Sequence, residues 1–233
     1  MSMQEKLGGR SPIKIALVAT DDLIATFGGT AEAEAELSAL IAREFAPGFE
    51  VEFEVLDPPG LAFESAAWDP IGESVSEGNH DIVLLSVAVW LGGLGTDPAP
   101  GEGPARGFGA LVEDVSRRLK EGTGAHGVLV NGSTLDPTDP TFDYSGAPET
   151  ARERIRRLNL ACFMASMAEG VSVVDVDRIV ADLGGEGHVR GPLDYSPELR
   201  ERIRVELARI MDDIGFFESR PLLAQVGQRT END

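Results

Sequence analysis

Cysteine and histidine are scarce in this sequence, which contains one cysteine and three histidines among 233 residues. The single cysteine, Cys162, has no partner in its own chain, so the fold cannot depend on a disulfide framework and a reducing compartment is its natural setting. Cys162 also lies in a helical, mostly apolar stretch. We interpret it as a buried, inert thiol.

Basic residues are scarce as well: 20 Lys and Arg stand against 40 Asp and Glu, a net charge of -20. Such a charge repels phosphate backbones and anionic membranes, and it indicates a solvated acidic surface. The longest apolar run, residues 82–91, is too short to cross a bilayer, and residues 1–12 contain no apolar signal segment. We expect a cytoplasmic protein with a small-molecule substrate, no cofactor, no metal and no nucleic-acid or membrane partner. The sequence leaves open whether the chain forms a homo-oligomer.

Short apolar runs alternate with longer segments of helical period, a pattern typical of a parallel sheet covered by helices. The expected strands are residues 14–19, 49–55, 82–89, 128–131 and 171–176, and the expected helices are 30–45, 108–120, 149–169 and 198–214. We therefore predict one α/β/α domain with a five-stranded parallel sheet over residues 13–215. Residues 1–12 form an N-terminal extension and 216–233 a C-terminal tail in this prediction.

Gly- and Pro-rich segments follow two of these strands, at residues 92–107 and 132–148. Ligands of open α/β sheets bind at the carboxyl ends of the strands, so such loops can form pocket walls. Asn131, Ser133 and Tyr144 add hydrogen-bonding groups there, which favours the pocket for the second loop. For the first loop a loose surface insertion is favoured.

Several acidic residues are expected at the same carboxyl edge: Asp21, Asp22, Asp175, Asp177 and Asp194. Acids clustered in a partly dry cleft push their pKa values apart, so that one serves as general acid beside an ionised base. The same oxygens could instead coordinate Mg²⁺ or Ca²⁺. Asp175 and Asp177 could also simply cap the following turn.

Of the histidines, only one is placed to join the acids. His80 and His126 precede their strands and therefore lie at the opposite end of the sheet. His188 is left as the histidine able to reach the carboxyl edge.

The order of short motifs resembles the SGNH/GDSL hydrolase family, whose members are flavodoxin-like esterases and acyl hydrolases. Thr20-Asp21-Asp22-Leu23 is similar to its first block, Gly60 to the glycine of its second, and Asp81-Ile82-Val83-Leu84-Leu85 to the strand before its third. Residues 154–160 and 170–176 resemble its penultimate helix and strand. Asp194-Tyr195-Ser196-Pro197-Glu198 stands where the family places its catalytic histidine.

The departures from this family concern its catalytic groups. By the resemblance Asp22 replaces the serine nucleophile, Asp194 the histidine, and Gly191 the aspartate that orients it. A carboxylate has no proton for a base to remove, so serine chemistry is not available to Asp22. The third block reads Ala88-Val89-Trp90-Leu91 and lacks the family's side-chain amide, a group worth about 3 kcal/mol where such donors have been removed.

Three hypotheses follow. In the first, Asp22 and Asp194 perform acid/base chemistry in a repurposed SGNH-like enzyme that acts on a small ester, acyl compound or related metabolite. In the second, the chain is an ordinary serine esterase in which His188 and Ser133, or a water, do the work. In the third, it is an inactive binding or accessory protein. The residues expected to hold the substrate are Asp21, Trp90, Asn131, Ser133 and Tyr144.

Overall fold

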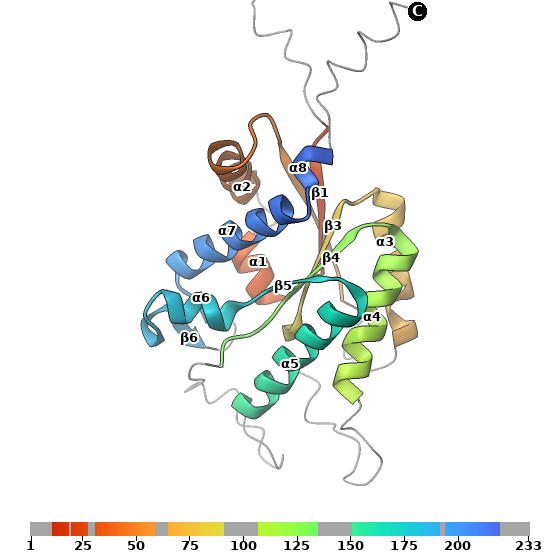
Figure 1. The fold of residues 1–233 in the computed structure, drawn as a ribbon, viewed down its shortest axis with the longest axis vertical. Helices are drawn as coiled ribbons and strands as arrows, with labels where there is room; N and C mark the ends of the chain where they lie inside the picture. Colours follow the sequence, from red (N-terminus) through yellow and green to blue (C-terminus); the bar gives the residue numbers. More distant parts are fainter. Residues whose placement is uncertain are drawn as a thin grey trace, which may run out of the picture.

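The computed structural model describes residues 11–18, 20–27, 31–58, 65–90, 107–134, 151–191 and 194–219. Within these ranges five parallel strands form one sheet in the order β2-β1-β3-β4-β5. The strands are β1 (Ile13–Val18), β2 (Val51–Leu56), β3 (Ile82–Ser86), β4 (His126–Val130) and β5 (Ser172–Val174). The predicted five-stranded parallel sheet is confirmed (Figure 1).

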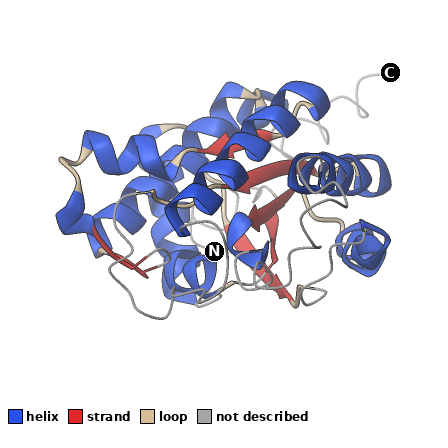
Figure 2. Ribbon diagram, turned by 90° about the horizontal axis from the view of Figure 1, so that it is seen from below, coloured by secondary structure: helices blue, strands red, loops and turns tan. Residues whose placement is uncertain are grey.

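Helices cover both faces of the sheet, which gives three layers (Figure 2). One face carries α1 (Asp21–Phe27), α2 (Ala31–Glu44), α6 (Val176–Asp182), α7 (Pro197–Asp213) and α8 (Phe216–Ser219). The other carries α3 (Asp69–Gly78), α4 (Gly107–Thr123) and α5 (Ala151–Glu169). None of the helices in the described ranges has the length and hydrophobicity that a bilayer crossing requires.

Short elements complete the described chain. They are the 3-10 turns η2 (Ser65–Trp68), η3 (Val87–Trp90) and η7 (Glu186–His188), and the antiparallel pair β6 (Val189–Gly191) and β7 (Asp194–Tyr195).

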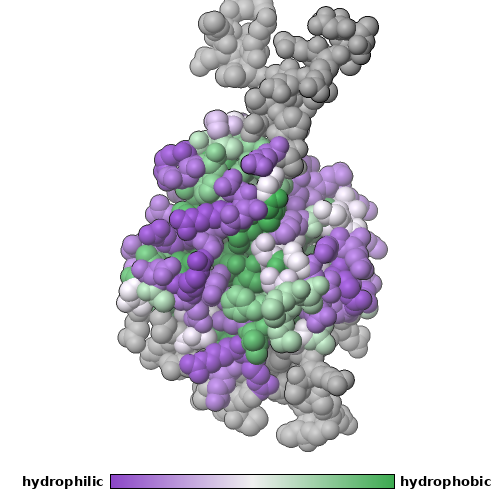
Figure 3. All heavy atoms as spheres, in the orientation of Figure 1, coloured by the Kyte–Doolittle hydropathy of each residue, from purple (hydrophilic) through white to green (hydrophobic). Residues whose placement is uncertain are grey.

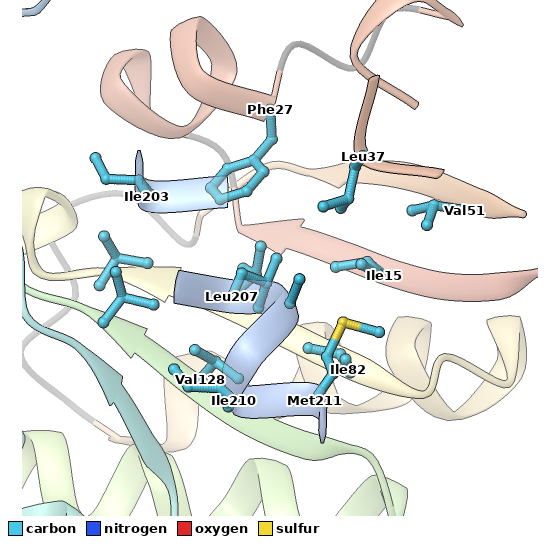
Figure 4. Close-up of a cluster of buried hydrophobic side chains, with 14 of the residues drawn as sticks. Ile15, Phe27, Leu37, Val51, Ile82, Val128, Ile203, Leu207, Ile210 and Met211 are labelled. Atoms are coloured by element: carbon cyan, nitrogen blue, oxygen red, sulfur yellow. The ribbon is translucent and has the colours of Figure 1, made fainter. Parts of the chain in front are cut away.

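The two cores follow from the alternation of side chains along each strand. In β1, Ile15 and Leu17 face the α1, α2 and α7 layer, whereas Ala16 and Val18 face α3, α4 and α5. Figure 4 shows the first core, where Leu207 of α7 lies among side chains of the strands and of α1 and α2. Because both of its faces are buried, β3 is apolar from Ile82 to Leu85.

The structure differs from the sequence prediction in its short elements. α1, α3 and α6 were not predicted, because seven to ten residues with few apolar positions give little periodic signal. The predicted strand at 82–89 ends at Ser86 and continues as η3. α8 lies within the predicted tail, and its Phe217 is buried against Phe49.

Candidate functional site

The chain changes direction between β1 and β3. From β1 it runs outward to β2, and it then returns to the other side of β1 to form β3. Ligands of open α/β sheets bind outside the carboxyl ends of the strands at such a switch point. Asp22 follows β1 there, and Ser86 is the last residue of β3.

Asp22 and Ser86 are in direct contact. The Ser86 hydroxyl donates to Asp22 Oδ2 over 2.7 Å, and Ser86 Oγ accepts from the backbone N–H of Ala88 over 3.1 Å. Asp22 is only 1% exposed. The start of α1, which follows β1, and the end of β3 therefore supply the two halves of one buried polar contact.

The other oxygen of the carboxyl group, Asp22 Oδ1, is buried with no hydrogen-bond partner. Burial raises the pKa of Asp22, while the hydroxyls of Thr20 and Ser86 and the backbone N–H groups at the start of α1 act to lower it. The Thr20 hydroxyl lies close enough to Asp22 to lower the pKa of its carboxyl group. Its distance and angles do not satisfy the criteria of a hydrogen bond, so Thr20 Oγ1 is buried without a partner. Asp22 thus combines an unpartnered oxygen with a raised proton affinity.

Tyr195 of β7 is the second buried ionisable group of the site. Its ring is 2% exposed, and its oxygen accepts a hydrogen bond from the backbone N–H of Ser133. Burial first, and then the negative charges of Asp22 and Asp177, raise the pKa of Tyr195 well above its usual value. The phenol is therefore a neutral O–H group close to Asp22.

Sequence reasoning missed Tyr195 and selected its neighbour Asp194 instead. Asp194 is 57% exposed at its side chain and pairs with Arg200 over 3.3 Å. Successive residues of a strand point to opposite sides, so when Asp194 faces solvent, Tyr195 faces the interior. Among the described contacts none joins the Asp22 and Asp194 carboxyl groups, so the predicted carboxylate pair gains no support.

His188 lies in η7, and its ring is held at the start of α7. His188 Nδ1 lies 3.1 Å from Ser196 Oγ and 3.7 Å from Glu198 Oε2. Ser196 Oγ also caps α7 by accepting from the backbone N–H of Leu199. These contacts tie His188 to the surface near α7, and no described contact connects it to Asp22.

Asn131 is buried and uses both ends of its amide within the fold. Its Nδ2 donates to Asp175 Oδ1 over 3.0 Å, and its Oδ1 accepts from the backbone N–H of Val176 over 2.7 Å. Asp175 in turn caps α6 by accepting from the backbone N–H of Arg178. These contacts show Asn131 and Asp175 joining the end of β4 to the start of α6.

A second set of contacts fixes the segment that follows Asn131. Asn159 of α5 accepts from the backbone N–H of Gly132 and donates to its carbonyl, over 3.1 and 2.8 Å. Asp177 accepts from the backbone N–H and hydroxyl of Thr134 and from Asn159 Nδ2. Ser133, whose N–H contacts Tyr195, is therefore held from both sides. Sequence reasoning missed Asn159, although a polar residue at a core-facing helical position was a usable signal.

This arrangement predicts a stability effect at Asn159. Asn159→Ala leaves the buried backbone groups of Gly132 without partners, each costing about 1–3 kcal/mol, so we expect a loss of about 2–4 kcal/mol. Chemical denaturation measures it. Ser166→Ala in the same helix is the control and should change stability by less than about 0.5 kcal/mol. Equal effects of the two substitutions would contradict the role of Asn159.

The other predicted site residues differ in their burial and in their contacts. Trp90 is buried and packs on Trp68, with ring centroids 5.6 Å apart, and both indole N–H groups are buried without a partner. Asp21 is exposed, and Ser133 is fully buried. Tyr144 and Gly60 lie outside the described residues.

Neither a cluster of metal-binding side chains nor an exposed cysteine is found in the part of the chain that the structure describes. No group of three or more His, Cys, Asp or Glu side chains there is arranged to hold a metal ion. Cys162 is buried, as predicted, and burial raises its pKa to about 12.

Comparison with known proteins gives similarity at the level of structure. No family model matches the sequence, and no curated protein matches it. A lipase/acylhydrolase from Enterococcus faecalis is similar, with 18% identity over 85% of this chain and 94% of its own, at a TM-score of 0.54. The acetyl xylan esterase AlAXEase is 12% identical over 87% of this chain and 99% of its own, also at 0.54. A variant of Axe2, an acetyl xylan esterase from Geobacillus stearothermophilus, is 14% identical over 89% of this chain and 96% of its own, at 0.55.

Proposed function

Because the chain has the fold of SGNH/GDSL-type esterases and acylhydrolases, we propose that it is an enzyme acting on a small ester or acyl substrate. The acid/base group of the proposed site is Asp22, which takes the position of the serine nucleophile. The supporting observation is its carboxyl group at the switch point, with Oδ2 held by Ser86 and Oδ1 buried without a partner.

This geometry suits a carboxylate that moves a proton. In the proposed step Asp22 Oδ1 accepts a proton from a water molecule as the water oxygen attacks the acyl carbon, and it returns the proton to the leaving oxygen. Ser86 fixes the orientation of the carboxyl group. The raised pKa of Asp22, caused by burial, makes its carboxylate a stronger base than an exposed one.

Tyr195 and the segment around Ser133 support the same group in this proposal. The neutral Tyr195 hydroxyl, held by the Ser133 N–H, lies close enough to Asp22 for the charge of that carboxylate to raise the pKa of Tyr195. Asn159 and Asp177 fix the backbone that carries that N–H. Asp194 and His188, which face other partners, are left out of the proton transfer.

Isotope labelling tests this function. The protein is screened on acetyl and short acyl esters, the class indicated by the names of the esterases that share the fold, and the active substrate is then hydrolysed in ¹⁸O-water. We expect ¹⁸O in the released acid, none in Asp22 after a single turnover, and no labelling by a fluorophosphonate. Label in the Asp22 carboxyl would indicate a covalent anhydride, and a fluorophosphonate adduct would indicate an ordinary serine esterase; either result contradicts the proposal.

A binding or accessory role is the second candidate function, and burial favours it. Asp22, Trp90 and Tyr195 are each no more than 2% exposed, so a substrate reaches Asp22 only if neighbouring side chains move. Absence of turnover on the whole ester panel, together with thermal stabilisation by one of its members, would support this role, since preferential binding to the native state raises Tm.

A further inference from the structure

The two edge strands of the sheet differ in length. β5 forms one edge and has 3 residues, whereas β2 forms the other and has 6. An edge strand presents unpaired backbone N–H and C=O groups, and native proteins protect such edges by shortness, by proline or lysine, by a bulge or by a covering helix. β2 contains neither proline nor lysine, and its register with β1 is unbroken. Protection of the β2 edge therefore has to come from a neighbouring element.

Alternate N–H groups of β2 point away from β1. The carbonyl of Glu50 accepts from the backbone N–H of Ile13 over 2.7 Å. Because the C=O and N–H of one trans peptide point in opposite directions, the N–H of Val51 points to the free edge. These directions repeat every second residue along a strand, so the N–H groups of Phe53 and Val55 point the same way.

Side chains of α2 accept from two of these outward N–H groups. Ser38 Oγ accepts from the N–H of Val51 over 2.9 Å, and Glu34 Oε1 accepts from the N–H of Phe53 over 3.0 Å. The two oxygens occupy the places that carbonyl oxygens of an added strand would take. Val55 lies beyond this cover: none of the described hydrogen bonds engages its N–H, and its side chain is exposed.

The fit between α2 and the edge follows from the repeats of a helix and a strand. Four residues of an α-helix rise about 6.0 Å, and two residues of a parallel strand rise about 6.6 Å. Glu34 and Ser38 are i and i+4 on α2, so a helix that runs antiparallel to β2 brings them to alternate N–H groups. Leu37 and Ile41 are buried in the core and anchor the helix, and Figure 4 shows Leu37 next to Val51.

We infer that Glu34 and Ser38, which we call the α2 guard, keep β2 from pairing with β2 of a second copy. The same edge of two molecules can meet antiparallel across a two-fold axis and join both sheets into one. Such pairing requires the outward N–H donors that the α2 guard already engages. The outer surface of α2 carries exposed Glu32 and Glu36, and Figure 3 shows hydrophilic side chains where α2 and α7 lie in Figure 1. Neither α2 nor β2 supplies a residue of the proposed active site, so the α2 guard is independent of the proposed chemistry.

Amide hydrogen exchange of the full chain tests the two contacts. In Glu34→Ala the N–H of Phe53 should exchange at least about threefold faster, because one hydrogen bond is lost. Ser38→Ala should have the same effect on the N–H of Val51. Glu34→Gln is the matched control, since it removes the charge but keeps an acceptor oxygen, and it should retain most of the protection. Unchanged exchange in both alanine variants, or equal acceleration in Glu34→Gln and Glu34→Ala, would overturn the inference.

Sedimentation tests the consequence for association. The double variant Glu34→Ala/Ser38→Ala should self-associate with a dissociation constant at least about tenfold below that of the wild type. Adding Val55→Lys should reverse this change, because a lysine on an exposed edge strand opposes pairing. Glu32→Ala, at an exposed position of the same helix, is the control and should sediment as the wild type does. If circular dichroism shows that the double variant is unfolded, Ser38→Ala is compared in its place. Association no stronger than that of the wild type, or association that persists with Val55→Lys, would refute the α2 guard.

Discussion

Asp22→Asn is expected to lower turnover by about 10²–10⁴-fold, the usual contribution of a positioned acid/base group, while the protein stays folded. An amide cannot accept the proton that Asp22 Oδ1 takes from water in the proposed step. It does keep the shape of the carboxyl group and an oxygen that can accept from Ser86. Loss of activity would therefore report the chemistry of the group rather than its packing.

Steady-state kinetics on the best substrate of the ester panel measures the effect. If Asp22 acts only in the proton transfer, kcat and kcat/KM fall together, because the interaction that is lost belongs to the transition state. Asp182→Asn is the matched control, since it makes the same change at an exposed carboxylate at the end of α6. Full activity of Asp22→Asn would refute the proposed role, and so would equal losses in both variants.

The sheet was predictable because its signal is distributed over many residues. Runs such as Ile82 to Leu85 are apolar throughout, as is typical of strands buried on both faces. β2 alternates with glutamates, as an edge strand does, and the structure places it at the edge of the sheet. Both features can still be recognised when the predicted end of a strand is wrong by one or two residues.

The site depends on single residues and was harder to predict. Asp194 and Tyr195 are neighbours in the sequence, and the orientation of the two-residue strand β7 alone decides which of them is buried. Asn131 looked available for a substrate because the sequence does not show that Val176 and Asp175 use its amide. Periodicity gives the face of a long helix, but it does not give the direction of a side chain in a short strand or turn.

The contact between Asp22 and Ser86 was not predicted either. Asp22 was singled out through a resemblance, whereas Ser86 lay inside an expected strand that was drawn three residues too long. Strand ends are the positions where side chains of neighbouring strands converge. An error at the end of β3 therefore hid the partner of Asp22 without affecting the prediction of the fold.

The stability of the protein is expected to depend on the ionisation of Asp22, and Asp22→Asn should remove that dependence. Burial raises the pKa of Asp22 above its ordinary value of 3.8. The native state therefore binds the proton more tightly than the unfolded state. The stability that this group contributes is fully present below pH 3.8 and is lost as the pH rises through the raised, native-state pKa.

Asn at position 22 is neutral throughout, so the difference in Tm between Asp22→Asn and the wild type should grow as the pH rises above 3.8 and level off once the pH exceeds the raised, native-state pKa of Asp22. In a domain of this size each kcal/mol corresponds to about 2–4 °C in Tm, which makes the trend measurable by thermal denaturation. Other carboxyl groups titrate alike in both proteins, so their contributions to stability largely cancel in the difference in Tm. The control Asp182→Asn should show a flat difference. If the difference for Asp22→Asn were flat as well, or fell with rising pH, the carboxyl group would not have the raised proton affinity on which its proposed role as a strong base depends.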